Sequence, residues 1–154
     1  MKRSLPLFLS LFTTVTCIGQ QLDLAPLNAA FAGTVVFKID KQDRFVMDFM
    51  DESGRYRQDI VPLIHLDPEA VHYSAEEKTI VLECGKEHVQ CFTKEIFKLD
   101  VVRLTSRSTL PNPEKDPEGA NAIALFKDLI RTAQSELKQT ADETSPDRTR
   151  KKPR

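Results

Sequence analysis

Residues 79–92 read TIVLECGKEHVQCF. Two runs rich in β-branched and apolar residues flank a short polar segment with a glycine, Gly85-Lys86-Glu87-His88, and this pattern predicts a β-hairpin. Each arm carries one cysteine, Cys84 before the turn and Cys91 after it. We expect the segments on either side to add further antiparallel strands around this hairpin.

The neighbouring segments alternate apolar and polar residues between turn signals, which is typical of short strands. The strands expected before the turn of the hairpin are 34–40, 45–49, 55–61, 70–74 and 78–84, and those expected after it are 88–93 and 96–104. Pro62 ends the third of them or places it at a sheet edge, because proline cannot donate a hydrogen bond to a neighbouring strand.

One amphipathic helix is expected after a loop rich in proline and charge at residues 111–119. Its apolar residues recur at helical spacing, and Asn121 is the expected N-cap. The apolar stripe consists of Ala122, Ile123, Phe126, Leu129, Ile130, Ala133 and Leu137. About seven strands followed by one helix predict an α+β fold, in which a C-terminal helix caps a bent antiparallel sheet or barrel.

The start of the chain has the composition of an export signal. Lys2 and Arg3 precede an apolar run at residues 5–15, and small residues follow in Cys17-Ile18-Gly19. This order predicts a signal peptide over residues 1–19 and therefore a periplasmic or secreted protein. A lipoprotein anchor on Cys17 is the weaker alternative, because the residues before it match a lipoprotein signal poorly.

Three segments follow the expected signal peptide. Residues 20–33 are expected to form an extended lead-in, because Pro26 interrupts a helix there. The domain itself is expected at residues 34–138, and residues 139–154 are expected to be a disordered tail with a basic end, since they have little apolar surface to bury. The apolar run of the signal is too short to span a bilayer, and no later segment is suitable. No integral membrane segment is therefore expected after cleavage.

The charge of the chain argues against nucleic acid as a partner. Removal of Lys2 and Arg3 from the 22 Lys and Arg residues leaves 20 basic residues against 23 acidic ones, a net charge of −3. Binding to nucleic acid depends on the neutralisation of phosphates by basic residues. An exported acidic domain is a poor candidate for that role.

The order of the expected elements resembles a pleckstrin-homology-like domain, in which the final helix plugs one open corner of a strongly bent sheet. The Ile60-Val61-Pro62-Leu63 step, the Cys84 hairpin and the helical segment Phe126-Lys127-Asp128-Leu129-Ile130 also resemble uncharacterised exported bacterial proteins of this build. The resemblance covers residues 34–137. The tryptophan usual in the helix of the family is absent, and Phe126 or Leu129 is expected to fill its place.

The resemblance also suggests a ligand-binding position. In lipid-binding members of the family, basic residues around the first hairpin hold phosphoinositide head groups, and Lys38, Lys41 and Arg44 lie in a similar place. Asp40 and Asp43 are interleaved with them and would oppose an anionic ligand. Solvated hairpin charges are the alternative interpretation of these residues.

Cys84 and Cys91 remain after the expected cleavage, and an even number of cysteines in an exported chain favours a disulfide. The six residues between them can form a turn with two flanking pairs, so that the sulfurs meet across the hairpin. A tight two-residue loop would instead pair Cys84 with Val89 and leave the thiols free. The alternative is a zinc site formed by Cys84, His88, Cys91 and His72, but their spacing fits the usual zinc patterns only loosely. We therefore expect a disulfide, with no metal and no cofactor.

Two functional hypotheses follow. The first is an exported, non-catalytic binding or assembly domain for a protein or peptide of the cell envelope, because small sheet domains often present a groove or an exposed edge to an extended peptide. The second is a small periplasmic enzyme or metal-binding protein that uses His72, His88 and a nearby carboxylate or the cysteines. The first is favoured, because the sequence ties no nucleophile to His65 or His72 and contains no phosphate loop, nucleophile elbow or metalloprotease motif. The placement of the three histidines distinguishes the two.

Overall fold

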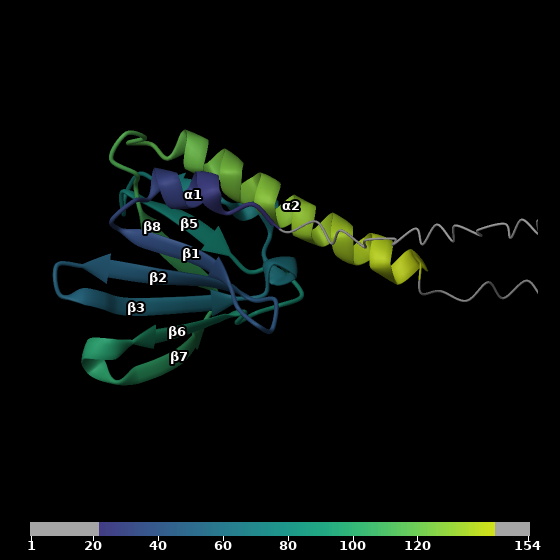
Figure 1. The fold of residues 1–154 in the computed structure, drawn as a ribbon, viewed down its shortest axis with the longest axis horizontal. Coiled ribbons are helices and arrows are strands. Elements are labelled where there is room, and N and C mark those ends of the chain that lie inside the picture. Colours follow the sequence, from purple (N-terminus) through teal and green to yellow (C-terminus); the bar gives the residue numbers. More distant parts are fainter. Residues whose placement is uncertain (1–21, 144–154) are drawn as a thin grey trace, which may run out of the picture.

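The computed structural model describes residues 22–143, with side chains up to residue 139. Within this range the chain forms eight strands in two antiparallel sheets, a short N-terminal helix and one long C-terminal helix (Figure 1). The predicted α+β class with a C-terminal helix is therefore confirmed. The barrel alternative is wrong, because the strands of the described region belong to two separate sheets that do not close on each other.

The larger sheet has five strands in the order β1-β2-β3-β6-β7, and the smaller one has three in the order β4-β5-β8. The strands of the larger sheet are β1 (Val35–Ile39), β2 (Phe45–Asp51), β3 (Gly54–Val61), β6 (Phe92–Ile96) and β7 (Val101–Thr105). Those of the smaller sheet are β4 (His72–Ser74), β5 (Thr79–Glu83) and β8 (Arg107–Pro111). Three short 3-10 helices connect them, namely η1 (Leu63–His65), η2 (Pro68–Ala70) and η3 (Phe97–Leu99).

The hairpin predicted at residues 79–92 is wrong. β5 pairs with β4 and β8, whereas β6 pairs with β3 and β7, so residues 84–91 carry the chain from one sheet to the other. Ile80, Val81 and Leu82 are all buried, which marks β5 as a strand covered on both faces. The alternation of side chains specifies the two faces of a strand but does not specify its neighbour.

The strand predicted at residues 96–104 is also divided. β6 ends at Ile96, η3 follows, and Asp100 takes a left-handed conformation with φ 50° that turns the chain back into β7. The hairpin of this region is therefore β6–β7. Strand β8, which follows directly at Arg107–Pro111, was not predicted.

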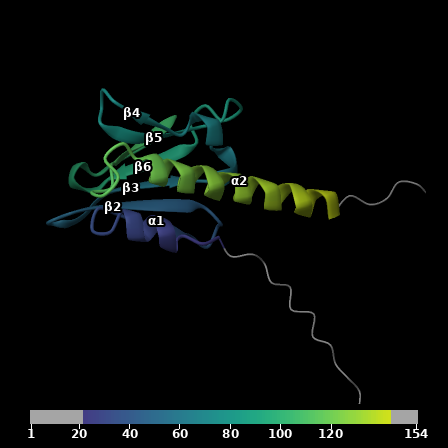
Figure 2. The same cartoon turned by 90° about the horizontal axis from the view of Figure 1, so that it is seen from above.

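Both helices contribute to the core. Ring contacts between centroids 5.2 to 6.5 Å apart join Phe31 after the N-terminal helix, Phe37 on β1, Phe45 on β2 and Phe126 on the C-terminal helix. The C-terminal helix, α2 (Ala120–Glu143), runs between α1 with β2 on one side and β4 with β5 on the other (Figure 2). Its apolar stripe is buried at Phe126 but ends before Leu137, which is 54% exposed.

The start of α2 differs from the prediction in its cap. The helix begins at Ala120, and Asp116 Oδ2 accepts hydrogen bonds from the backbone N–H groups of Asn121 and Ala122. Asp116 therefore satisfies the free donors of the first turn, and Asn121 lies inside the helix. Gly119 precedes the helix with φ +68°, and a Cβ there would lie 2.6 Å from the side chain of Ile80.

The lead-in predicted as extended contains a helix, α1 (Ala25–Ala30). Pro26 lies in its first turn, where the missing N–H would have no partner in any case, so proline begins this helix instead of interrupting it. α2 continues to Glu143, so the first residues of the predicted tail are helical. The predicted signal peptide, Cys17 and the rest of the tail lie outside the described residues.

Neither of the two helices between residues 22 and 143 is long and apolar enough to cross a membrane.

Candidate functional site

Lys38, Lys41 and Arg44, the basic residues expected to bind a ligand, lie on and around the β1–β2 hairpin. Two of them are already paired, because Lys38 Nζ lies 2.5 Å from Asp48 Oδ2 and Arg44 Nη2 lies 2.7 Å from Asp40 Oδ2. Lys41 is exposed in the turn. These pairings leave little positive charge for an anionic ligand, and the ligand-binding role of the three residues stays a prediction.

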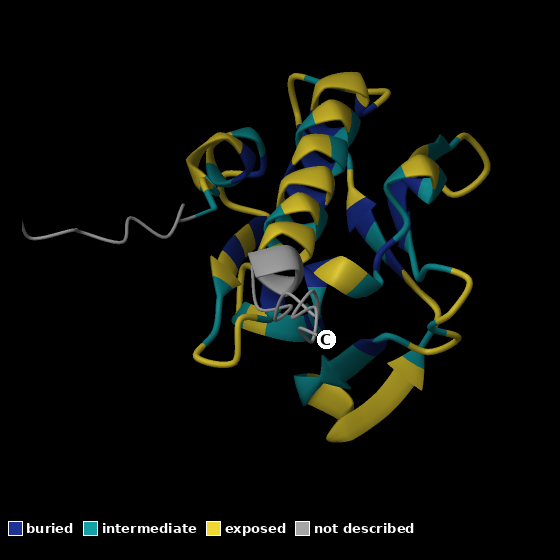
Figure 3. Cartoon of the chain, turned by 90° about the vertical axis from the view of Figure 1, so that its right-hand side faces the viewer, coloured by how far each residue is buried: buried dark blue, intermediate teal, exposed yellow. Residues whose placement is uncertain are grey.

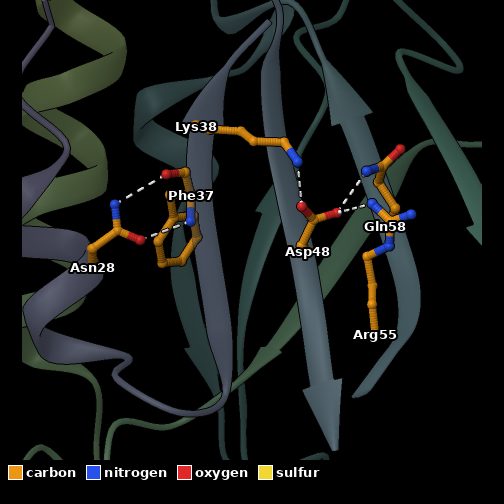
Figure 4. A network of polar contacts seen from close by, with 6 residues as sticks. All are labelled: Asn28, Phe37, Lys38, Asp48, Arg55 and Gln58. Carbon is orange, nitrogen blue, oxygen red and sulfur yellow. Dashed lines mark hydrogen bonds and ion pairs between the residues drawn. The ribbon is translucent and has the colours of Figure 1, made fainter.

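Asp48 is the centre of a polar network on the outer face of the larger sheet (Figure 4). Its carboxylate accepts hydrogen bonds from Lys38, Arg55 and Gln58. Burial raises the pKa of Asp48, but the hydrogen bonds from Lys38 and Gln58 and the charges of Lys38 and Arg55 outweigh this effect and hold the pKa below its usual value. The carboxylate is thus kept ionised and fully engaged by its own neighbours.

The two sulfurs of Cys84 and Cys91 lie 2.08 Å apart, so the expected disulfide is present. It spans the crossover between the sheets, where Cys84 follows β5 and Cys91 precedes β6. Both sulfurs are used in this bond and are not free to bind zinc as thiolates. Among the described residues, no group of three or more His, Cys, Asp and Glu side chains is placed to hold a metal ion.

The histidines are not arranged as the enzyme hypothesis requires. The rings of His65 and His88 stack with their centroids 3.7 Å apart, whereas His72 is exposed and places Nδ1 2.8 Å from the carbonyl oxygen of Ala70. Burial lowers the pKa of His65, and the neighbouring His88 lowers it further. Within residues 22–139, no hydrogen bond or ion pair joins a histidine to a carboxylate. The hypothesis paired His72 with His88, and the structure instead pairs His65 with His88.

The β1 edge of the larger sheet is closed by α1. The side-chain amide of Asn28 donates from Nδ2 to the carbonyl oxygen of Phe37 at 3.0 Å, and its Oδ1 accepts from the Phe37 N–H at 2.8 Å (Figure 4). Asn28 therefore uses both backbone groups that a neighbouring strand would need at the middle of β1. No further strand can pair there without displacing this side chain.

The opposite edge, β7, is open. Residues 101–104 are all exposed, with fractions of 64% for Val102 and 58% for Leu104. No hydrogen bond within the described region uses the backbone of these residues on the side away from β6. In Figure 1, β6 and β7 lie at the end of the molecule opposite α2, and Figure 3 shows a strand coloured as exposed at this end.

A buried polar cluster lies beside this edge, between the two sheets. Asp59 is fully buried and accepts a hydrogen bond from the Ser108 hydroxyl on β8, while Arg57 Nε lies 3.1 Å from Asp59 Oδ1. Arg57 also donates to the carbonyl oxygen of Thr109 and stacks over the Phe49 ring at 3.5 Å. The contacts of Asp59 with Ser108 and of Arg57 with Thr109 connect β3 of the larger sheet to β8 of the smaller one. β6 pairs with β3 and β7 pairs with β6, so both strands are attached to this connection.

Lys94 on β6 completes the cluster from the side of the open edge. Its Nζ is 3.8 Å from Asp59 Oδ2, which is a loose ion pair. Burial lowers the pKa of Lys94; the attraction of Asp59 opposes this, and repulsion from Arg57, Arg103 and Arg107 adds to it. The face of the sheet next to β7 therefore carries an excess of positive charge in a domain that is acidic overall.

A broad groove of about 1030 Å³ lies on another side of the molecule, between the start of the described chain, η1 and the last turns of α2. Its apolar lining includes Leu22, Leu24, Ile39, Leu63, Ile64 and Leu137. It is wide and open, and its lining also contains the polar residues Asp23, Gln42, Asp43 and Glu136.

The open edge was not identified from the sequence. Val101, Val102 and Leu104 have the composition of a buried strand, and their exposure results from the tertiary position of β7. The one residue in the sequence that indicates exposure of this strand is Arg103, which interrupts the apolar run.

Comparison of the chain with protein-family models, curated proteins and solved structures finds no match.

Proposed function

We propose that this chain is an exported, non-catalytic binding domain that takes up an extended segment of a protein partner as an additional strand beside β7. Addition of a strand to an exposed sheet edge is a common mode of peptide recognition, in which backbone hydrogen bonds supply affinity and side-chain positions supply specificity. The open edge of β7, exposed on both faces, is the observation that carries this proposal.

Two further features support it. The Cys84–Cys91 disulfide is typical of proteins in oxidising compartments, which agrees with export to the periplasm or beyond. The fully buried carboxylate of Asp59 is already bound to Arg57 and Ser108, and within residues 22–139 no carboxylate pairs with a histidine. Membership of the pleckstrin-homology-like class remains a prediction.

The experiment begins with selection of strand-binding peptides. A displayed library of random peptides is selected on the exported protein with its disulfide intact, and enriched peptides are synthesised with and without N-methylation of alternate backbone amides. N-methylation removes the donors that a β7 partner needs, so we expect it to weaken binding by at least about tenfold. Affinity is measured by fluorescence anisotropy.

A matched pair of variants locates the binding edge. Leu104→Lys changes an exposed apolar residue of the open edge, and Val36→Lys makes the same kind of change on the closed edge, where Val36 is 45% exposed. Only Leu104→Lys should weaken the selected peptides. Peptides that bind equally well after N-methylation, or that respond equally to the two substitutions, would contradict the proposed function.

A further inference from the structure

One row of directly opposed residues crosses the larger sheet from the closed edge to the open one. The strand register joins, in order, Phe37, Met47, Asp59, Lys94 and Arg103. Directly opposed residues of antiparallel strands point to the same face of a sheet. These side chains therefore share the inner face, where Ser108 of the smaller sheet reaches Asp59. The row begins in the core beside Asn28 and ends in an arginine on the open edge.

Positive charge exceeds negative charge at the end of this row. The single carboxylate of Asp59 is shared between Arg57, the Ser108 hydroxyl and the more distant Lys94. Arg103 is exposed and makes no hydrogen bond or ion pair with any residue that the structure describes. A new strand beside β7 would place one side chain directly opposite Arg103 on this face, and a carboxylate there would meet an unpaired guanidinium.

The outer face of β7 has the opposite character. Val102 and Leu104 point to this face on either side of Arg103, and both are more than half exposed. They lie in rows with Glu95 and Thr93 of β6. Because side chains alternate between faces along a strand, residues of a partner next to the one opposite Arg103 would lie against these two apolar side chains.

We propose that the partner segment is an extended strand with an acidic residue between two apolar residues, bound beside β7 with its acidic side chain opposite Arg103. This inference rests on the proposed function, because it names the chemistry of the strand that the open edge accepts. The apolar side chains of the segment cover Val102 and Leu104, and its carboxylate pairs with Arg103 next to Lys94.

A second copy of this chain fits the edge poorly. Two-fold antiparallel pairing of β7 centred on its middle residue would place Arg103 directly opposite the same residue of the other copy. Like charges in directly opposed positions destabilise a strand pair. An acidic strand from a different protein removes this conflict.

The first test uses a capped, fluorescein-labelled peptide, Ser-Thr-Ser-Val-Glu-Val-Ser-Thr-Ser, and two versions in which Gln or Lys replaces the central Glu. Binding to the exported, oxidised protein is measured by fluorescence anisotropy. The Gln version should bind about two- to fivefold more weakly, the range expected for one cross-strand charge pair, and the Lys version more weakly still. High salt should narrow the difference, because the screening length falls to about 3 Å at 1 M.

The second test reverses the charge on the protein. Arg103→Glu should invert the order of affinities, so that the Lys peptide binds more tightly than the Glu peptide. The matched control is Lys115→Glu, which reverses an exposed charge in the loop before α2 and should leave the order unchanged. Both positions are exposed, so thermal unfolding should show both variants folded.

The outcomes separate this inference from the proposed function. In one outcome, the Glu and Gln peptides bind equally well while their N-methylated versions bind more weakly. This result would contradict the acidic character of the partner and would leave strand addition at β7 standing. Binding of none of the three peptides, or binding that ignores N-methylation, would overturn both. If Arg103→Glu makes the protein self-associate while the preference for Glu persists, Arg103 only protects the edge from aggregation and the inference is wrong.

Discussion

The two edges of the larger sheet differ, because β1 is covered by another part of the chain and β7 is exposed. At β1, the side chain of Asn28 hydrogen-bonds to both backbone groups of Phe37, and α1 packs beside the strand. At β7, residues 101–104 expose both faces and the backbone edge. Unpaired edges invite association with other chains, and proteins usually cover or disrupt them. In this sheet one edge is covered and the other is exposed, and the proposed function assigns the exposed edge to a partner strand.

The position of the core explains which edge is closed. Phe37 is 2% exposed and lies within the phenylalanine cluster, so unpaired backbone groups there would be removed from water at a considerable cost. Residues 101–104 of β7 lie outside the core, and their free backbone groups can bond to water. Along the row of opposed residues that crosses the sheet, the side chains on β1 and β2 are apolar and those on β3, β6 and β7 are charged. Asp59 on β3 is the first charged residue of this row.

The largest loss of stability should come from substitution of Asp59, which connects the strands next to the open edge to the rest of the molecule. Asp59→Ala leaves Arg57 and Lys94 without their counter-ion, and breaking a buried ion pair in this way costs about 3–5 kcal/mol of unfolding free energy. Chemical denaturation measures this loss. The control Lys94→Met removes a loosely paired, desolvated cation and should cost much less, so equal losses in the two variants would contradict the role given to Asp59.

The disulfide should have the next largest effect, because it anchors the first strand of the β6–β7 hairpin to the end of β5. Replacement of Cys84 and Cys91 by serine should lower the unfolding free energy by about 2–3 kcal/mol, since the closed loop is short. The measurement is denaturation of the oxidised protein and of the double variant under identical conditions. Thiol titration of the denatured, unreduced protein should find neither cysteine free.

Substitution of Asn28 should open the closed edge of the larger sheet. Asn28→Ala removes both hydrogen bonds to Phe37 and leaves partly buried backbone groups without partners, which should cost about 1–3 kcal/mol. Asn28→Asp keeps the acceptor for the Phe37 N–H but turns a carboxylate oxygen toward the Phe37 carbonyl oxygen, so repulsion between two acceptors should make its cost at least as large. Sedimentation should also detect self-association of the alanine variant through β1. A monomeric variant of unchanged stability would show that Asn28 does not protect this edge.

The smallest effect is expected from the histidines. Single replacement of His65, His72 or His88 by alanine should change peptide affinity by less than about twofold, because none of them lies on β7. Anisotropy with the Glu-containing peptide is the measurement. Loss of biological activity in one of these variants, with folding and peptide binding intact, would favour the enzyme hypothesis.

The sequence predicted the local features well. The first three strands, the C-terminal helix and the disulfide all depend on short-range patterns, and the structure contains each of them. The features that were missed depend on contacts between distant residues. β5 and β6 were predicted as a hairpin, because the alternation of side chains does not specify which strand lies next to which. The cap of α2 was also missed, because Asp116 lies in the loop before the helix.

The candidate site was missed for the same reason. Asn28 reaches Phe37 only because α1 folds back onto β1, and Pro26, which begins that helix, was interpreted as a residue that interrupts one. Val102 and Leu104 resemble core residues in every local property, so their exposure follows only from the order of strands in the sheet. By contrast, Lys38, Lys41 and Arg44 were visible in the sequence, but the pairing of Lys38 with Asp48 depends on strand register.

The most direct measurement is amide hydrogen exchange, followed by NMR on the isotope-labelled, oxidised protein with and without the Glu-containing peptide. The peptide should protect every second backbone amide of residues 101–105, because only alternate amides of β7 point away from β6. The Phe37 amide, already bonded to Asn28, should exchange slowly in both samples. Protection at saturation that spares β7 and appears instead around Leu24 and Ile64 would place the binding site in the apolar groove and contradict strand addition at β7.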